Sequence, residues 1–504
     1  MTVNIERFAI VICVVIAIIA LVAPQTLITL IQPIIQQSIS SIGGAFFLFI
    51  NGLFLALLLL CVSPLGAKKM GGEHSKVEFS TFGWLSMLFA AGMGSGLIFW
   101  GVAEPAIHYT DTPLKQSFYP DKLGASMALT MLNWGVHAWA LYAAFGVLLG
   151  GITKAISKPE ELSAPVLFGL GKWPGQSVSQ SVHNGICLVA IIAIFFGVVG
   201  TIANASMLLK NGMQQALNNI GFSIDTIWLA LVILSCITGL YFVSTRLGLK
   251  KGIQSLSKFN VYLTLIMMFL VISSVPLEPI LSTFTSAIAE YTMLVISGAW
   301  QLDSQLVDAN WANGWTYNYY FWWLAWGPFV GVFLARISRG RTLRQYILAV
   351  VFIPTLLTLV WFSVFGGSAI AIAQHLPTDL LSVIANDYTQ GVYFFFSHLG
   401  TMGEVLTLLS FVLLVVFVAT SADSALLVIK QLCAPSSAKG SIFIWSVLMA
   451  IISLCLVLIS DETLNRNIAV IGALPFVVIF VFQIVGFVKA LVSEMSEEDD
   501  KKAP

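Results

Sequence analysis

Apolar stretches of about 20 residues follow one another along the whole chain, separated by shorter polar segments. A stretch of that length crosses the hydrocarbon core of a bilayer as an α-helix. The pattern predicts twelve membrane-spanning helices, at residues 8–24, 43–63, 82–101, 125–150, 184–208, 225–244, 259–275, 317–335, 346–365, 404–429, 441–459 and 467–488. Of the 504 residues, 58% are hydrophobic and 10% are charged, which excludes a sizeable soluble domain. We therefore expect an all-α integral membrane protein with a single polytopic domain over residues 1–504.

The distribution of Lys and Arg predicts how these helices are oriented. If the N-terminus lies in the cytoplasm, 20 of the 24 basic residues fall in inner segments. Such an excess is typical of cytoplasmic loops, so both termini are expected in the cytoplasm. The formal net charge is zero, which gives no indication of a nucleic-acid partner. The chain shows no nucleophile–base pair or metal-ligand cluster at usable spacing, so we do not expect an enzyme.

Two spans contain residues that disfavour a regular helix. In the third span, Gly92, Gly94 and Gly96 alternate with Met93 and Ser95. Each glycine disfavours helix by about 1 kcal/mol relative to alanine, and unwound backbone is tolerated in a membrane where it lines a cavity. The alternative is close packing of helices, but packing motifs usually space glycines by four. The alternation therefore favours a helix broken at a binding site.

A second predicted interruption is Gly327-Pro328 in the eighth span. Breaks five spans apart suggest two five-helix repeats of inverted topology, preceded by two further helices. The expected division is 1–81 for the leading helices and inner loop, 82–275 for the first repeat, 276–316 for an outer surface helix and loop, 317–488 for the second repeat, and 489–504 for a short, acidic, disordered cytoplasmic tail.

Two short segments place aromatic rings well inside predicted spans. The rings are Trp134, Trp139 and Tyr142 in the fourth span, and Trp322, Trp323, Trp326 and Phe329 in the eighth. On regular helices they share arcs of about 140° and about 120°. Indole faces attract cations such as quaternary ammonium groups, although Trp and Tyr also form belts at membrane interfaces. Because these rings lie away from the span ends, the pattern favours a cage for a cation.

Four strings resemble those of the betaine–carnitine–choline transporters, a family with the LeuT-type fold. They are GMGSGLIFWGVAEP (92–105), WGVHAWALY (134–142), WWLAWGPFVGVFLARISRGRT (322–342) and TSADS (420–424). The resemblance implies two inverted five-helix repeats after two extra helices, an onium substrate and a homotrimer. It further implies a box around the onium group made of Trp134, Trp139, Tyr142 and Trp323.

The same resemblance implies roles for the remaining site residues. Trp322 and Trp326 would complete the site or line the inward path, and Phe329 would close it towards the cytoplasm. The substrate carboxylate would meet the unwound backbone of Gly92, Met93, Gly94, Ser95 and Gly96, because free N–H groups suit an anion.

Sodium-coupled members of the family bind an ion between the broken third span and the tenth. By resemblance, Ala90, Met93 and Phe417 would offer carbonyl oxygens, and Thr420 and Ser421 would offer hydroxyls. Hard cations favour such ligands. The alternative is that both hydroxyls donate hydrogen bonds to carbonyls of their own helix.

Four positions depart from patterns found elsewhere in the family. Ile194 and Val198 stand where some members have the threonines of a second sodium site. Gln254 stands where sodium-independent exchangers have an arginine, and Gly96 where choline carriers often have an aspartate. An aspartate would favour a substrate with net positive charge, so Gly96 favours a zwitterion.

Other polar residues admit more than one interpretation. A structural role is preferred for Glu104, and Asp423 could support the sodium ligands or brace helix packing. Arg336, Arg339, Arg341 and Arg344 suggest contact with lipid phosphates, with gating pairs as the alternative.

Together these features lead to the hypothesis that the protein imports a zwitterionic onium compound, driven by sodium, across a bacterial inner membrane. Glycine betaine is the preferred candidate for this substrate. No cofactor is expected beyond the coupling sodium ion, and the partners are the substrate and the lipid bilayer. The alternatives are sodium-independent exchange of carnitine-like substrates and proton-coupled choline uptake.

Overall fold

The computed structural model describes residues 5–93, 96–111, 113–114, 119–152, 156, 160–171, 177–302, 306–376, 380–433, 440–460 and 462–500. Within these ranges the chain is helical and has no β-strand beyond an isolated bridge between Lys69 and Thr342. Eleven helices of this part are long and apolar enough to cross a membrane, and a bent pair raises the number to twelve. The predicted all-α integral membrane fold is confirmed.

The helices of the first half of the chain are α1 (Ile5–Val22), α2 (Pro24–Val62), α3 (Thr81–Met93), α4 (Gly96–Thr110), α5 (Lys122–Trp134), α6 (Val136–Leu149), α7 (Ala164–Gly169), α8 (Ser177–Asn219), α9 (Thr226–Gly248) and α10 (Gln254–Ser274). Those of the second half are α11 (Leu277–Met293), α12 (Ala309–Ala312), α13 (Asn318–Ile337), α14 (Leu343–Phe362), α15 (Ser368–Ala373), α16 (Leu380–Asn386), α17 (Tyr388–Ser397), α18 (Thr401–Cys433), α19 (Gly440–Ile459) and α20 (Glu462–Asp500).

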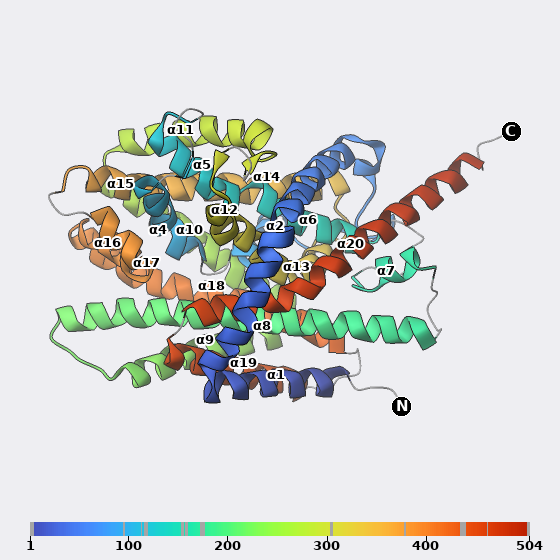
Figure 1. Cartoon of the computed structure of the whole chain (residues 1–504), viewed down its shortest axis with the longest axis horizontal. Helices are drawn as coiled ribbons and strands as arrows, with labels where there is room; N and C mark the ends of the chain where they lie inside the picture. The colour runs from blue at the N-terminus through green and yellow to red at the C-terminus, as the bar shows by residue number, and fades with distance from the viewer. Residues whose placement is uncertain are drawn as a thin grey trace.

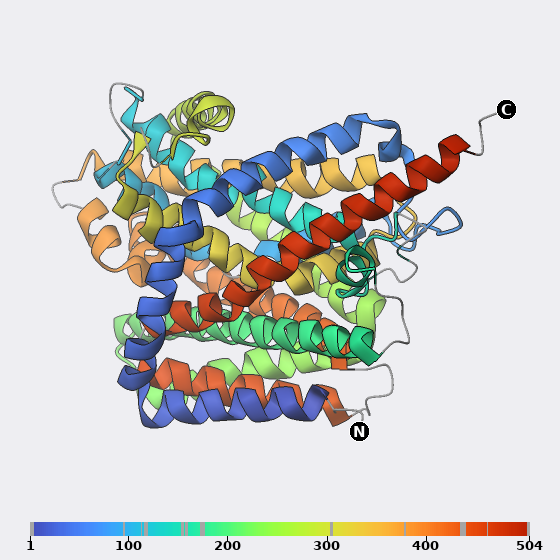
Figure 2. The ribbon, with the colours of Figure 1, turned by 45° about the vertical axis from the view of Figure 1, so that its right-hand side comes forward.

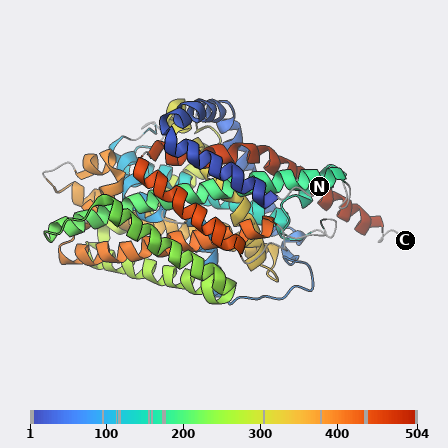
Figure 3. The same cartoon turned by 90° about the horizontal axis from the view of Figure 1, so that it is seen from below.

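Helix α13 occupies the centre of the bundle, where it packs against α6, α8, α18 and α20 (Figure 1). Its side chains are almost all buried, which is expected of a helix that is apolar on every side. Helices α1 and α19 pack against each other and cover one face of the bundle (Figure 3). The start of α1 and the end of α20 lie at the same end of the bundle (Figure 2).

The predicted spans 225–244 and 259–275 correspond to α9 and α10, which a π-helical turn at Leu249–Ile253 connects. The turn begins after Gly248, whose φ of +76° favours glycine. The turn brings Gly252 close to the backbone of α9, where a Cβ on Gly252 would collide with the carbonyl of Ser244. Helix α11, in the predicted outer segment, is nearly end-on in Figure 2, whereas α8 and α19 run across that view.

The predicted interruption at Gly327-Pro328 is wrong, because α13 continues through both residues. Proline in a membrane helix is tolerated where neighbouring helices pack around it. The glycines in this part of α13 do not unwind the helix. They allow it to lie close to α6. A Cβ on Gly327 would collide with the ring of Phe145 on α6, and one on Gly331 with the Cβ of the same residue. The two repeats therefore stay a prediction that rests on the resemblance.

The prediction of a disordered tail is wrong for residues 489–500, which continue α20 as far as Asp500. Two contacts hold this end of α20 against inner segments of the chain. The Lys489 ammonium donates to the Gly169 carbonyl at 3.0 Å, and Lys68 pairs with Glu494 at 3.0 Å. Composition alone missed these contacts, because they join residues far apart in sequence.

The arginines after α13 are engaged within the protein. Arg336 pairs with Glu78 at 2.8 Å and Arg339 with Glu160 at 2.6 Å, so the gating-pair alternative describes these two better than contact with lipid. Burial raises the pKa of Glu160, and the charges of the two arginines oppose that rise. The guanidinium of Arg341 lies 4.0 Å from the centre of the Trp84 ring, at cation–π distance.

We expect Gly331→Ala to destabilise the protein by about 1–3 kcal/mol, the usual range for overpacking, because the new methyl group collides with Phe145. Thermal unfolding in detergent measures the effect. Gly314→Ala is the control, because a Cβ there meets nothing within 4 Å. Equal unfolding temperatures for the two variants would contradict the close contact between α6 and α13.

Candidate substrate site and ion site

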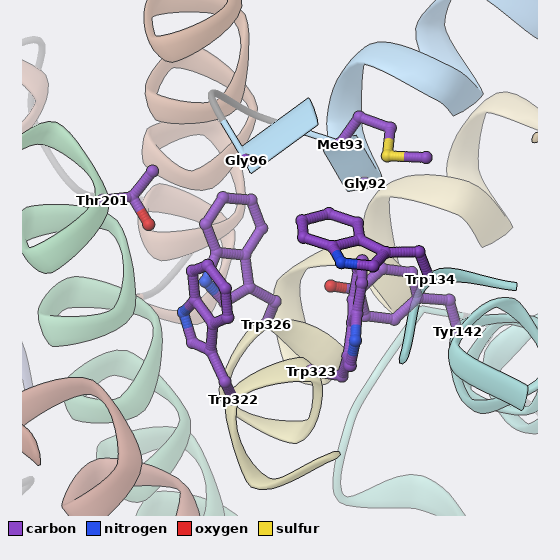
Figure 4. Close-up of a pocket in the computed structure, with 9 residues that line it drawn as sticks. All are labelled: Gly92, Met93, Gly96, Trp134, Tyr142, Thr201, Trp322, Trp323 and Trp326. Carbon is purple, nitrogen blue, oxygen red and sulfur yellow. The ribbon is translucent and has the colours of Figure 1, made fainter. Parts of the chain in front are cut away.

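One cavity brings together the glycine break and both aromatic segments. The space between its lining atoms is about 310 Å³ and includes open solvent, and the centre of a water-sized sphere can reach about 20 Å³ of it. Its lining comes from α3, α4, α5, α6, α8 and α13, and consists of Gly92, Met93, Gly96, Trp134, Tyr142, Thr201, Trp322, Trp323 and Trp326 (Figure 4). No charged side chain belongs to this lining among the described residues. Gly94 and Ser95, which were also predicted to bind substrate, lie outside the described residues.

The rings stand at steep angles to one another around this cavity. Trp323 makes edge contacts with Trp134 and with Tyr142, at centroid distances of 5.4 and 5.3 Å. Trp322 and Trp326 lie on the other side of the cavity (Figure 4). Ring faces with negative charge density therefore surround the space, which suits a cation that makes no hydrogen bonds.

Trp139 does not line the cavity but supports it from behind. Its ring contacts Tyr142 at 5.8 Å and Trp323 at 6.5 Å. Phe329 is fully buried and likewise lies beyond the lining, with its ring 5.3 Å from that of Trp326. The structure thus places both residues next to the cavity, behind a ring that lines it. The resemblance instead implies that Trp139 is part of the box around the onium group.

The predicted break in the third span separates α3, which ends at Met93, from α4, which begins at Gly96, and the two helices are bent by 60°. A Cβ on Gly96 would lie 2.5 Å from Trp134 Cη2, and one on Gly92 would lie 2.5 Å from Trp139 Cη2. Both glycines therefore let a ring approach the backbone. An aspartate in place of Gly96 would displace the Trp134 ring.

The fourth span is also broken, which the sequence analysis did not predict. Helix α5 ends at Trp134 and α6 begins at Val136, so Trp134 and Tyr142 do not share one helix. The break frees backbone groups that bind aromatic side chains. Trp323 Nε1 donates to the Asn133 carbonyl at 2.9 Å, and the Val136 N–H donates to the Tyr291 hydroxyl at 2.8 Å. These bonds fix the rings relative to the break.

A buried carboxylate, that of Glu104, holds Trp134, one of the rings that line the cavity. Glu104 Oε2 accepts hydrogen bonds from Trp134 Nε1 at 2.7 Å and from the Tyr319 hydroxyl at 2.6 Å. Its Oε1 accepts from Asn133 Nδ2 at 2.7 Å. Hydrogen bonds to an ionised acceptor are stronger than neutral ones, so Glu104 orients Trp134. The structural role preferred for Glu104 agrees with this geometry.

The proposed ion ligands lie where α3 meets α18, and the rings of Phe89 and Phe417 are 6.1 Å apart across this contact. Thr420 and Ser421 both donate to the Phe417 carbonyl, at 2.8 and 3.2 Å. This is the bonding of the alternative interpretation. Each hydroxyl oxygen still has acceptor lone pairs, so the bonding does not exclude a cation.

Asn260 on α10 adds an amide to this group that the sequence analysis missed. Its Nδ2 donates to Thr420 Oγ1 at 3.0 Å, and its buried Oδ1 has no hydrogen-bond partner. An unpaired buried oxygen is costly, which makes it a candidate ligand for a cation. Among the described residues no group of His, Cys, Asp or Glu could hold a metal.

Asp423, one turn beyond Thr420, is fully buried and braces helix packing. Ser244 on α9 donates to its Oδ2, and Ser424 donates to its Oδ1 at 3.2 Å. Thr201, another cavity residue that the sequence analysis missed, lies three residues after Val198 and therefore on the same helix face. That polar position in an apolar span was the signal that could have identified it.

Comparisons with known proteins identify the family of this chain. Residues 4–496 match the family described as "BCCT, betaine/carnitine/choline family transporter". The chain belongs to this family. Glycine betaine transporter OpuD of Bacillus subtilis is 30% identical over 498 residues, covering 95% of this chain and 94% of the relative. A glycine betaine transporter of Acinetobacter baylyi is 31% identical over an alignment that covers 94% of this chain and 71% of the relative. A glycine betaine/proline/choline/ectoine transporter of Vibrio parahaemolyticus is 32% identical over an alignment that covers 92% of this chain and 82% of the relative.

Membership of the betaine/carnitine/choline transporters makes the chain a transporter and not an enzyme. Most of the aromatic and glycine residues that the sequence singles out line the cavity, namely Gly92, Gly96, Trp134, Tyr142, Trp322, Trp323 and Trp326.

We expect Glu104→Gln to loosen the cage, because the amide NH2 group of glutamine replaces one acceptor oxygen with a donor. The single amide oxygen can accept either from Trp134 and Tyr319 or from Asn133, so at least one buried donor loses its acceptor, at a cost of about 1–3 kcal/mol. Thermal stability and intrinsic Trp fluorescence in detergent measure the change. The exposed Glu278→Gln is the control, and an unchanged Glu104→Gln protein would rule out the anchoring role.

Proposed function

We propose that this transporter imports glycine betaine or a closely similar zwitterionic onium compound together with sodium. The observation that carries the proposal is the cavity lined by aromatic rings and glycine backbone, with no charged side chain among the described residues of its lining. The rings suit the quaternary ammonium group. Because the lining supplies no acidic group, a substrate that carries its own carboxylate fits better than choline does.

The carboxylate end is proposed to meet the broken third span. Helix α4 begins at Gly96, and the N–H groups at the start of a helix have no partner within it. Gly96 borders the cavity, so a carboxylate in the cavity can reach these donors while its ammonium end stays between the rings. The two relatives named as glycine betaine transporters support this choice.

Sodium is proposed to bind between α3 and α18, with oxygens from Ala90, Met93, Phe417, Thr420 and Ser421. Each of these residues is buried, and Asn260 Oδ1 lies in the same contact without a partner. An ion there would join α3, which ends at the substrate cavity, to α18. Substrate and ion would then stabilise the same arrangement of α3, which is what coupling requires.

We place the protein in a bacterial inner membrane with both termini in the cytoplasm. The start of α1 and the end of α20 lie at one end of the bundle, and the excess of Lys and Arg falls on that side. Sodium-independent exchange and proton-coupled choline uptake are the competing functions, and uptake measurements separate them.

In proteoliposomes we expect accumulation of labelled glycine betaine only when a sodium gradient is imposed. Trp323→Leu should raise the KM about tenfold, because loss of a desolvated cation–π contact costs about 1–2 kcal/mol. The exposed Trp228→Leu is the matched control. Equal uptake without sodium, stimulated by betaine inside the vesicles, would support exchange and contradict symport.

The double variant Thr420→Ala, Ser421→Ala is expected to lose sodium stimulation of betaine uptake, because both proposed side-chain ligands are removed. Ser410→Ala on the same helix is the control, since Ser410 is also buried and donates to a carbonyl of α18 at 2.7 Å. Sodium stimulation that survives in the double variant would remove these ligands from the proposal.

A further inference from the structure

His108 is a buried histidine that the transport site does not otherwise use. It lies one turn after Glu104 on α4 and is fully buried. Neither Nδ1 nor Nε2 has a hydrogen-bond partner, and Nε2 lies 3.6 Å from Glu104 Oε1. A buried imidazole without partners is costly, so this residue calls for an explanation beyond packing.

The surroundings of His108 suit a positive charge. The rings of Trp315 and Trp311 lie 4.8 and 5.5 Å from the imidazole, measured between centroids. Aromatic faces and a neighbouring carboxylate both stabilise a cation. The two indoles are half-buried, so a single layer of rings separates His108 from the surface.

The link from His108 to the cage passes through one carboxylate. The oxygen nearest His108 is the one that accepts from Asn133, and the other oxygen accepts from Trp134 and Tyr319. If the imidazole gains a proton, both ring nitrogens carry a hydrogen, so Nε2 must donate and competes with Asn133 for Oε1. The carboxylate then moves towards His108, and its hold on Trp134 weakens.

We propose that His108 and Glu104 form a proton-binding site that opposes binding of the onium substrate. The proton comes from solution at the end of the bundle remote from the termini and is held on the imidazole beside the carboxylate. Three effects act in the same direction. The added charge repels the ammonium group, the indole loses electron density from its carboxylate partner, and the ring loses its orientation.

Other ionisable groups occur on the elements packed around α4. Tyr109 on α4 itself is covered by Lys122 of α5, whose ammonium lies 4.7 Å from the ring centre. The remaining groups are Asp121 at the start of α5, Asp308 at the start of α12, Asp387 at the start of α17, Tyr388 and Tyr393 on α17, Arg344 and Tyr346 on α14, and Tyr319 on α13. Among all of these, Glu104 is the group for which a contact with His108 is found.

The test is glycine betaine binding to the purified transporter in sodium buffer, measured by calorimetry at about pH 7.5 and about pH 5.5, on either side of the usual histidine range. We expect the Kd to rise at least about fivefold at the lower pH, the lower end of coupling between two sites. Reciprocity requires that betaine binding near pH 6 releases protons. Buffers that differ in ionisation enthalpy measure this release.

His108→Gln is expected to abolish both the pH dependence and the proton release, because the amide cannot be protonated. The exposed His375→Gln should keep both. Proton release that persists in His108→Gln, or a wild-type protein without release, would overturn the proposal; the wild-type measurement decides even if the variant does not fold. The inference rests on the proposed function, which fails separately if betaine does not bind at any pH.

Discussion

A single buried carboxylate fixes one wall of the ring-lined cavity. Glu104 has no access to solvent, and its two oxygens accept from an indole, a phenol and a carboxamide that belong to α5 and α13. An ionised group in an apolar interior is tolerated only when its lone pairs are occupied. Because the carboxylate needs all three donors, the donors must hold fixed positions, and Trp134 is one of them. The position of a ring at the cavity thus depends on the solvation of a buried carboxylate.

The second constraint is the use of broken helices to free backbone groups. The break before Gly96 exposes N–H groups next to the cavity, and the break at Gly135 exposes carbonyls that accept from aromatic donors. One break is proposed to serve the ligand, and the other serves the rings that surround it. In a membrane such irregular backbone survives only inside protein, which agrees with its position at the centre of the bundle.

Much of this could be predicted from the chain because apolar span length, basic loops and clustered rings are local properties. The Gly92–Gly96 break followed from the spacing of three glycines. Gly135 was missed because one glycine in a helix carries little information, and Gly327-Pro328 was overestimated for the same reason. Asn260 and His108 could not be identified, since their partners Thr420, Trp311 and Trp315 lie far away in sequence.

The contact between Phe145 and the glycines of α13 has a consequence for how the transporter changes shape. The side chain of Phe145 lies where any side chain on Gly327 or Gly331 would be, so this side chain of α6 packs directly against the backbone of α13. We expect two helices joined so closely to move as one rigid body. Tyr142 and Trp323, one on each helix, therefore keep their mutual geometry when the cavity opens to either side of the membrane. The onium group would meet the same pair of rings on arrival and on departure, and only the walls contributed by other helices would change.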